Sequence, residues 1–348
     1  MGANDLRVGI IGVGMMGADH AERIARRIAN ATLVAVSDPD QERAAQLAAR
    51  YEGVRTIADP LELIADEGVD AVVIASPGFV HEEQVLACIR HGKYAMCEKP
   101  LTMDSESSLR VVEAERSGGR PLIQVGFMRR FDPEYAAMKA LVDSGELGRL
   151  LLVHNTHRNK SVPSPEFRSE MIVRDSLVHE VDVARFLYGE EIERIQVISP
   201  APTSHAFEGV IDPQVAIFHM AGGGVVTSEV FVNCQVGYEV RCEAVAERGT
   251  VTAGRPQTGL YSTVASDEGG RWGGAVHPDF TVRFGRAYDL EIQSWVDASL
   301  RGEVVGPTSW DGYAATAVCT AGMESLASGE SVSVALADRE SLVAGAVG

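Results

Sequence analysis

The sequence predicts an α/β protein with two domains: an N-terminal doubly wound parallel sheet, and a second α/β domain built on a large, open, mainly antiparallel sheet. Three observations lead to this prediction. The chain has 348 residues, about twice the usual length for one hydrophobic core. Up to residue 127, β-rich runs alternate with helix-period stretches. Beyond it, β-rich runs follow one another across short turns. We therefore expect one domain over residues 1–126 and a second over residues 127–348.

The N-terminal half alternates strand and helix in strict turn. Stretches with helical periodicity begin at Met15, Gln41, His81 and Ser105. Alternation of this kind predicts a parallel sheet covered by helices on both faces. The expected strands are residues 7–12, 32–38, 70–77, 94–100 and 121–127.

The turn after the first expected strand has the pattern G-x-G-x-x-G, formed by Gly12, Gly14 and Gly17 around Met15 and Met16. The first glycine allows a tight turn, the second lets a pyrophosphate approach the backbone, and the third lets helix pack on strand. The helix N-terminus adds partial positive charge. Because the pattern follows a strand and opens a helix, it predicts a dinucleotide-binding loop.

Asp38 ends the second expected strand, 21 positions after Gly17. An acid at this place accepts hydrogen bonds from the adenosine ribose hydroxyls and repels a 2′-phosphate. Pro39 and Asp40 offer no compensating cation, so the sequence favours NAD over NADP. The alternative is that Asp38 only caps the next helix.

Two further segments follow strands at the carboxyl edge of the sheet, where such folds bind ligands. Ser76, Pro77 and His81 follow the strand at 70–77, and we expect them to contact the cofactor, although His81 is also compatible with an exposed first helical turn. The stretch CEKPL ends the next strand. There Glu98 and Lys99 are expected at the cofactor, with Lys99 stabilising a developing alkoxide. The simpler alternative is a strand that ends at the surface because proline cannot continue it.

The second half begins with an expected helix from Asp132 to about residue 148 and a strand over residues 149–159. Further strands are expected over residues 193–199, 213–220, 224–234 and 238–246, and two long helices over 286–301 and 308–328. Alternation along the first strand places one set of side chains on one face. These residues are Leu151, Val153, Asn155, His157 and Asn159.

A helix is expected over residues 174–189, with a continuous apolar stripe. The stripe consists of Leu177, Val178, Val181, Ala184 and Leu187. Asp175 and His179 are four positions apart and so share the neighbouring face, with Asp182 one turn further. His titrates in the range that suits removal of a hydroxyl proton, and Asp175 would orient its ring. Taken alone, the pair also fits a structural histidine and a capping aspartate.

Composition excludes several classes of protein. Hydrophobic residues make up 45% and charged residues 23%, as in ordinary globular proteins. With 31 Lys and Arg against 49 Asp and Glu, the net charge is −18, which repels nucleic acid and anionic lipid. No segment reaches the ~18 apolar residues of a membrane-spanning helix, and the early apolar run does not end like a signal peptide. The five cysteines form no metal-ligand pattern, so no metal is expected. We expect a cytoplasmic protein.

These motifs together resemble the glucose-fructose oxidoreductase, inositol dehydrogenase and rhizopine catabolism family, and most closely its bacterial inositol dehydrogenases. The likeness runs through both halves, in CEKPL, QVGFMRRFD, HRN, DSLVHEVDV, NCQVGYEV, AYDLEIQ and PTSWDGY. It implies a Rossmann domain, a second α/β domain whose open sheet assembles a homotetramer, and oxidation of a cyclic polyol by NAD. By motif it makes Lys99, Asp175 and His179 catalytic. The residues implied to border the polyol are Lys99, Arg129, His157, Asn159, Asp175, His179 and Tyr238.

The expected substrate follows from the polar character of these residues. A ligand with few hydroxyls would leave buried donors and acceptors unpaired, at about 1 to 3 kcal/mol each. A ring with a hydroxyl on every carbon would satisfy them, and with the resemblance this indicates myo-inositol, oxidised at its axial hydroxyl to the 2-ketone. Scyllo-inositol or a pyranose sugar such as glucose is the alternative substrate. A non-catalytic nucleotide-sensing regulator is the alternative of another class.

Overall fold

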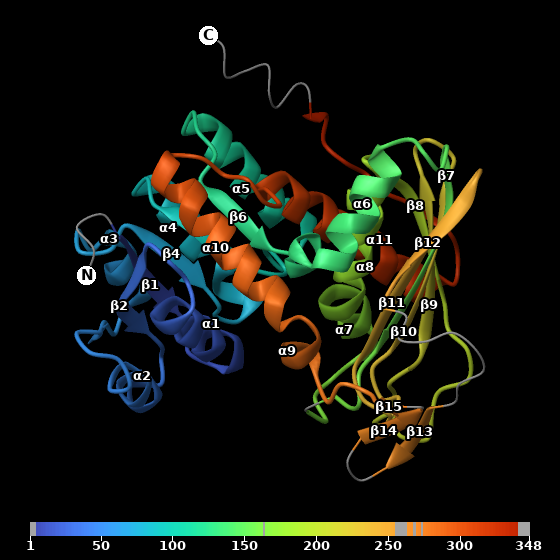
Figure 1. The fold of residues 1–348 in the computed structure, drawn as a ribbon, viewed down its shortest axis with the longest axis horizontal. Coiled ribbons are helices and arrows are strands. Elements are labelled where there is room, and N and C mark those ends of the chain that lie inside the picture. The colour runs from blue at the N-terminus through green and yellow to red at the C-terminus, as the bar shows by residue number, and fades with distance from the viewer. Residues whose placement is uncertain (1–4, 163, 255–262, 267–268, 273, 340–348) are drawn as a thin grey trace. The chain divides into compact units, whose positions relative to one another are not determined.

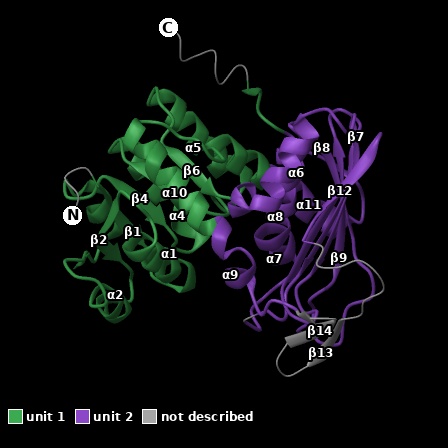
Figure 2. Ribbon diagram, in the orientation of Figure 1, with its two compact units in different colours: residues 1–127, 288–316, 336–348 green, residues 128–287, 317–335 purple. Residues whose placement is uncertain are grey.

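A computed structural model describes residues 5–162, 164–254, 263–266, 269–272 and 274–339 of the chain, shown in Figure 1. The chain divides into two compact units, coloured separately in Figure 2. Unit 1 comprises residues 1–127, 288–316 and 336–348, and unit 2 comprises residues 128–287 and 317–335.

Unit 1 therefore contains a segment that the sequence prediction placed in the second domain. Residues 288–316 return to unit 1 because helix α10, Gly285–Arg301, packs against the first helix of the chain, α1, Met15–Arg26. Asp289 forms an ion pair with Arg23, and the Gln293 side chain accepts from the amide of Ala29 at 2.8 Å.

The core of unit 1 is a six-stranded sheet of order β3-β2-β1-β4-β5-β6, parallel throughout. Its strands are β1 Leu6–Ile11, β2 Ala31–Ser37, β3 Arg55–Thr56, β4 Ala71–Ile74, β5 Tyr94–Glu98 and β6 Ile123–Gly126. The residues of β4 and β5 are all buried, because helices cover both faces (Figure 1). The doubly wound parallel sheet is confirmed.

The helices of unit 1 connect successive strands. Those after α1 are α2 Gln41–Ala48, α3 Pro60–Ala65, the short η1 Gly78–Val80, α4 His81–Arg90 and α5 Ser105–Ser117. Strand β3 and helix α3 were not predicted. Both are short, and β3 has only two residues, both exposed at the edge of the sheet.

Unit 2 is built on a seven-stranded sheet of order β12-β11-β7-β10-β9-β8-β16. Its strands are β7 Leu150–Arg158, β8 Ile192–Ile198, β9 Gln214–Met220, β10 Val225–Phe231, β11 Glu239–Ala246, β12 Gly249–Ala253 and β16 Val332–Ser333. The pairing is antiparallel except between β7 and β10, which run parallel. A small sheet consists of β13 Thr263–Ser266, β14 Gly269–Trp272 and β15 Gly274–Ala275.

The helices of unit 2 include α6, α7 and α8, which lie on one side of the large sheet in Figure 1. The helical elements are η2 Met128–Phe131, α6 Pro133–Asp143, α7 Ser169–Met171, the π-helical turn η3 Ile172–Leu177, α8 Val178–Tyr188 and α9 Phe280–Arg283. Helix α11, Ser309–Ser328, begins in unit 1 and ends in unit 2. The whole apolar stripe predicted for residues 174–189 is buried, which confirms the face that was assigned to the core.

One predicted detail of unit 2 is wrong. Helix α6 ends at Asp143, not near residue 148, because Gly145 and Gly148 adopt left-handed backbone conformations. On β7, Val153, Asn155 and His157 are buried, whereas Leu151 is half-buried and lies where the register with β11 shifts near the start of the strand. Within the described residues, every helix is too short or too polar to cross a bilayer.

Candidate functional site

The glycine loop of unit 1 has the backbone geometry that a phosphate site needs. Gly12 has a φ of +82°, and a Cβ there would collide with the backbone of Ala75 and Ser76. A Cβ on Gly17 would overlap the carbonyl oxygen of Gly12, so helix α1 can pack this closely only with glycine. At Gly14, by contrast, a Cβ would meet nothing within 4 Å, so the space beside the loop is open.

The N-terminus of α1 is also suited to an anion. Its N-cap is Gly14, no side chain caps it, and its first turn holds no acidic residue. The first amides of the helix therefore have no carboxylate competing for them. Met15, in this turn, is 69% exposed. The loop fits the pyrophosphate of a dinucleotide.

Asp38 follows β2 and is buried against this loop. Its Oδ2 accepts from the Val13 amide at 2.8 Å, and its Oδ1 accepts from the Asp40 amide at 2.9 Å and from Arg43 Nη2 at 2.7 Å. Burial opposes ionisation of Asp38, but the hydrogen bonds from Arg43 and the two amides lower its pKa. Asp38 is thus a carboxylate. The helix cap of α2 is Asp40, so the capping alternative for Asp38 is wrong.

The loop after β4 is fastened to the loop after β5 by His81. This histidine is buried rather than exposed, with Nδ1 2.9 Å from the carbonyl oxygen of Pro100 and Nε2 2.8 Å from that of Ser76. The Ser76 hydroxyl donates to Gln84 Oε1 at 2.6 Å. Both ring nitrogens of His81 thus face backbone carbonyls, and the side chain connects the loop after β4 to the loop after β5.

Glu98 ends β5 inside the protein, not at its surface. It is buried, and its Oε1 lies 2.8 Å from Nε2 of His20, a fully buried side chain on α1. Burial alone would raise the pKa of Glu98, but His20 and then Lys99 lower it, so the carboxylate is ionised. Nδ1 of His20 has no hydrogen-bond partner among the described residues. The surface-end alternative for CEKPL is therefore wrong.

Unit 2 contains a buried cluster of charged and aromatic residues. Arg129 and Glu180 form an ion pair through Nη1 and Oε1, and both side chains are almost fully buried. His157 Nδ1 lies 3.2 Å from Glu180 Oε2 and 3.2 Å from Arg129 Nη2. Burial alone would raise the pKa of Glu180, but Arg129 and His157 lower it. Protein groups therefore hold Arg129 through both terminal nitrogens of its guanidinium.

His179 and Tyr238 extend this cluster. The ring of His157 lies 6.2 Å from that of His179 and 5.7 Å from that of Tyr238, each edge to face. Burial raises the pKa of Tyr238 to about 12, so its hydroxyl is protonated. The Tyr238 amide donates to the carbonyl oxygen of His277 at 2.7 Å, which fixes the residue against the segment before α9. The structure thus brings together Arg129, His157, His179 and Tyr238.

Asp175 lies in the π-helical turn η3 and His179 in the first turn of α8. π-turns inside α-helices occur frequently at functional sites. The Asp175 carboxylate accepts from Nε and Nη2 of Arg174 at 2.7 and 2.8 Å. Asp182, one turn beyond His179, is fully buried and accepts from Arg130 through both oxygens. Asp182 therefore has a structural role.

Two asparagines on and after β7 have side-chain oxygens that no described group pairs with. Asn159 Oδ1 and Asn155 Oδ1 are buried atoms without a hydrogen-bond partner in the described part of the chain. Asn155 also donates from Nδ2 to Ser228 Oγ at 3.2 Å. Buried acceptors of this kind are normally paired, so a ligand or water with hydroxyl donors fits them.

Sequence reasoning missed His20, Arg43 and Glu180. His20 and Glu180 pair with residues far along the sequence, on other elements, and no local pattern reveals such pairs. Arg43 alone had a local signal. Asp40 caps α2, and side chains in the first turn of a helix point back toward its N-terminus, so Arg43 reaches the residue that precedes the cap.

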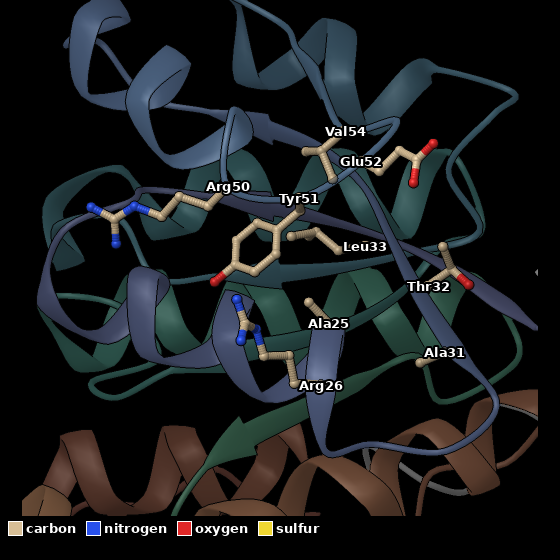
Figure 3. Close-up of a pocket in the computed structure, with 9 residues that line it drawn as sticks. All are labelled: Ala25, Arg26, Ala31, Thr32, Leu33, Arg50, Tyr51, Glu52 and Val54. Carbon is tan, nitrogen blue, oxygen red and sulfur yellow. The ribbon is translucent and has the colours of Figure 1, made fainter.

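A surface cavity of about 290 Å³ lies elsewhere in unit 1 (Figure 3). It is lined by Ala25, Arg26, Ala31, Thr32, Leu33, Arg50, Tyr51, Glu52 and Val54. Figure 3 shows the Tyr51 ring above Arg26, and the Tyr51 hydroxyl donates to Glu22 at 3.0 Å. The cavity lies at the start of β2, the opposite end of that strand from Asp38, and so away from the edge where doubly wound sheets bind ligands.

Comparison with known proteins places both halves of the chain in one family. Residues 6–127 match the family model described as an oxidoreductase family with an NAD-binding Rossmann fold. Residues 135–252 match the model of the GFO/IDH/MocA C-terminal domain.

Similar proteins cover almost the entire chain. Inositol 2-dehydrogenase 1 of Mycolicibacterium vanbaalenii is 55% identical over 97% of this chain and 99% of its own length. Inositol 2-dehydrogenase of Mycolicibacterium smegmatis is 53% identical over 97% of this chain and 99% of its own length. The crystal structure of myo-inositol dehydrogenase from Lactobacillus casei in complex with NAD(H) and myo-inositol matches with a TM-score of 0.89 and 33% identity. It covers 97% of this chain and 99% of that one. Scyllo-inositol dehydrogenase from the same organism, with bound NAD(H) and scyllo-inositol, matches with a TM-score of 0.83 and 26% identity. The match covers 95% of this chain and 100% of that one. Because relatives and family models match both halves of the chain, it belongs to the GFO/IDH/MocA family of oxidoreductases, which have an NAD-binding Rossmann domain.

Proposed function

We propose that this protein is an NAD-dependent inositol 2-dehydrogenase that oxidises myo-inositol to 2-keto-myo-inositol. The observation that carries the proposal is 55% identity, over 97% of the chain, to a relative named inositol 2-dehydrogenase. Scyllo-inositol is the alternative substrate, because solved structures of a myo-inositol dehydrogenase and of a scyllo-inositol dehydrogenase both match the chain.

Residues of unit 1 would hold the cofactor, and residues 1–126 form the proposed NAD-binding domain. The open space beside Gly14 and the uncapped start of α1 suit the pyrophosphate, and the ionised Asp38 suits the ribose hydroxyls. Met15 and Phe79 are 69% and 74% exposed. They lie in the first turn of α1 and in η1, which follow the neighbouring strands β1 and β4. Exposed apolar side chains at a binding edge are typical of a surface that a ligand covers. When bound, NAD accepts a hydride from the substrate carbon.

The proposed catalytic residues are Lys99, Asp175 and His179. His179 takes the proton of the reacting hydroxyl, and Asp175 stabilises the imidazolium that results. Lys99 stabilises the negative charge that develops on the oxygen. The ionised carboxylate of Glu98 places a negative charge directly before Lys99 in the chain. Retention of all three residues opposes the alternative of a non-catalytic regulator.

Residues 127–348 form the proposed substrate and assembly domain. His157, Asn159 and Tyr238 would donate to or accept from the remaining hydroxyls. Arg129 would act mainly by holding His157, since Glu180 and His157 already engage its guanidinium. His81 would act on the cofactor side by holding the loops that bear Ser76 and Lys99.

The test is a comparison of substrates. Purified protein is mixed with NAD and, separately, with myo-inositol, scyllo-inositol, glucose and a simple secondary alcohol, and reduction of the nicotinamide is followed by absorbance. We expect kcat/KM to be highest for myo-inositol. If kcat/KM is highest for scyllo-inositol or glucose, the proposed reaction stands but myo-inositol is not the preferred substrate. If it is highest for the simple alcohol, the proposal that polar residues select a polyol is contradicted.

We further propose that the enzyme works in the cytoplasm as a homotetramer assembled through the open face of the large sheet. Side chains on that face include Leu152, Ile198 and Ile217, and the first two are 37% and 44% exposed. Exposed apolar side chains on a sheet face without a helix layer are typical of a surface that another subunit covers. Light scattering at micromolar concentration is expected to give the tetramer mass, and a monomer would contradict the assembly.

A further inference from the structure

Asp38 already accepts more hydrogen bonds from the protein than a carboxylate that binds both ribose hydroxyls can keep. A carboxylate has about four positions for accepting hydrogen bonds. In this structure Val13, Asp40 and Arg43 already donate to it. The two neighbouring ribose hydroxyls of NAD need two positions, so they exceed what remains, and one of the present donors has to leave.

Arg43 is the donor that can leave. The Val13 and Asp40 amides belong to the main chain, and each is fixed, the first in the glycine loop and the second at the capped start of α2. The Arg43 side chain is 49% exposed, against 3% for Asp38. It also has a second carboxylate close by, because the charge of Asp40 contributes to the raised pKa of Arg43.

We propose that Arg43 is a specificity-determining residue that competes with NAD for Asp38 and, once displaced, is the cation placed to accept the 2′-phosphate of NADP. The negative charge of Asp38 repels that phosphate, whereas the positive charge of Arg43 would bind it. The preference for NAD is then set by the balance of these two side chains and not by Asp38 alone. This inference rests on the proposed use of NAD.

The balance makes opposite predictions for the two nucleotides. Arg43→Gln removes the competitor, and NADH should bind about 1.5- to fivefold more tightly, the strength of a half-exposed ion pair. The same change should not improve binding of NADPH. Asp38→Ser removes the repulsion and frees Arg43, so NADPH should bind at least about tenfold more tightly than to wild type, as expected for a charge-assisted hydrogen bond to phosphate.

The experiment measures dissociation constants of NADH and NADPH by calorimetry, without turnover, for wild type, Arg43→Gln, Asp38→Ser and the double variant. Arg50→Gln is the matched control, because it removes one arginine of the same segment at the cavity of Figure 3. Thermal unfolding of each variant checks the fold. We expect the double variant to lose the NADPH binding gained by Asp38→Ser, and Arg50→Gln to match wild type.

Two outcomes would overturn the inference. In the first, Arg43→Gln weakens NADH binding, which would make Arg43 a support of Asp38 and not a competitor. In the second, the double variant keeps the NADPH affinity of Asp38→Ser. Failure of the proposed function looks different, because wild type would then bind neither nucleotide.

Discussion

Replacing Glu180 by glutamine tests the buried cluster of unit 2 most directly. The change keeps the size of the side chain and removes its charge. Arg129 would then be left as a buried guanidinium without a carboxylate, since both side chains of the pair are at most 1% exposed. Removing one partner of a buried ion pair costs about 3 to 5 kcal/mol. For a domain of about 150 to 250 residues, this corresponds to a fall in Tm of roughly 6 to 20 °C.

The assay is differential scanning calorimetry, with urea unfolding as a second measurement. Glu193→Gln is the control, because it removes an exposed carboxylate of the same unit and should leave Tm within about 2 °C of wild type. The double variant Arg129→Met, Glu180→Gln removes both charges. It should be more stable than Glu180→Gln alone, because no buried charge is left unpaired.

The pH dependence of this effect has a definite sign. The folded-state pKa of Glu180 lies below its ordinary value of 4.5. Its contribution to the free energy of unfolding is therefore complete above about pH 4.5 and declines as the pH falls through the lowered folded value. The difference between wild type and Glu180→Gln should shrink in acid. Equal stability of the two proteins at pH 7, or a double variant less stable than Glu180→Gln, would refute the reasoning.

Other variants test the remaining parts of the site. His179→Ala should lower kcat by roughly two to four orders of magnitude, with the Kd of NADH near that of wild type. Wild-type turnover in this variant would show that His179 is not the general base. Lys99→Met should behave likewise in steady-state kinetics, and an unchanged kcat would exclude Lys99 from the chemistry. Gly17→Ala should lower both Tm and NADH affinity, since its Cβ meets the Gly12 carbonyl oxygen, whereas Gly14→Ala should keep Tm and lose affinity only. Calorimetry separates the two, and a wild-type affinity in Gly14→Ala would place the pyrophosphate elsewhere.

The parts of the fold that follow a local period were predictable. Strands of a doubly wound sheet are continuous apolar runs, and the helices between them carry a 3.6-residue pattern, so β1, β4 and β5 were located from the sequence alone. Strand β3 was not predicted, because its two exposed residues, Arg55 and Thr56, are too few to show a hydrophobic periodicity. The early end of α6 escaped because the two left-handed glycines that follow it are a property of the backbone, not of hydrophobicity.

The candidate site divides in the same way. The glycine loop and Asp38 stand at fixed spacings that chemistry dictates, and their geometry in the structure fits the predicted use. The sequence does not reveal the partners that lower the pKa values of the site residues or hold their side chains in place. Glu98 and its partner His20 are separated by 78 positions. Only the folded sheet, with α1 packed on it, makes them neighbours, and so the lowered pKa of Glu98 depends on tertiary structure.

The contact between His20 and Glu98 bears on how such enzymes can be recombined. Helix α1 carries the glycine loop at its start and His20 within it, while Glu98 is the residue before Lys99. A nucleotide-binding cassette grafted from another Rossmann protein would bring its own glycines but not this histidine. The graft would leave the buried carboxylate of Glu98 without its histidine partner, next to the proposed catalytic residue Lys99. Exchange of cofactor modules in this chain therefore has to transfer α1 and the end of β5 together.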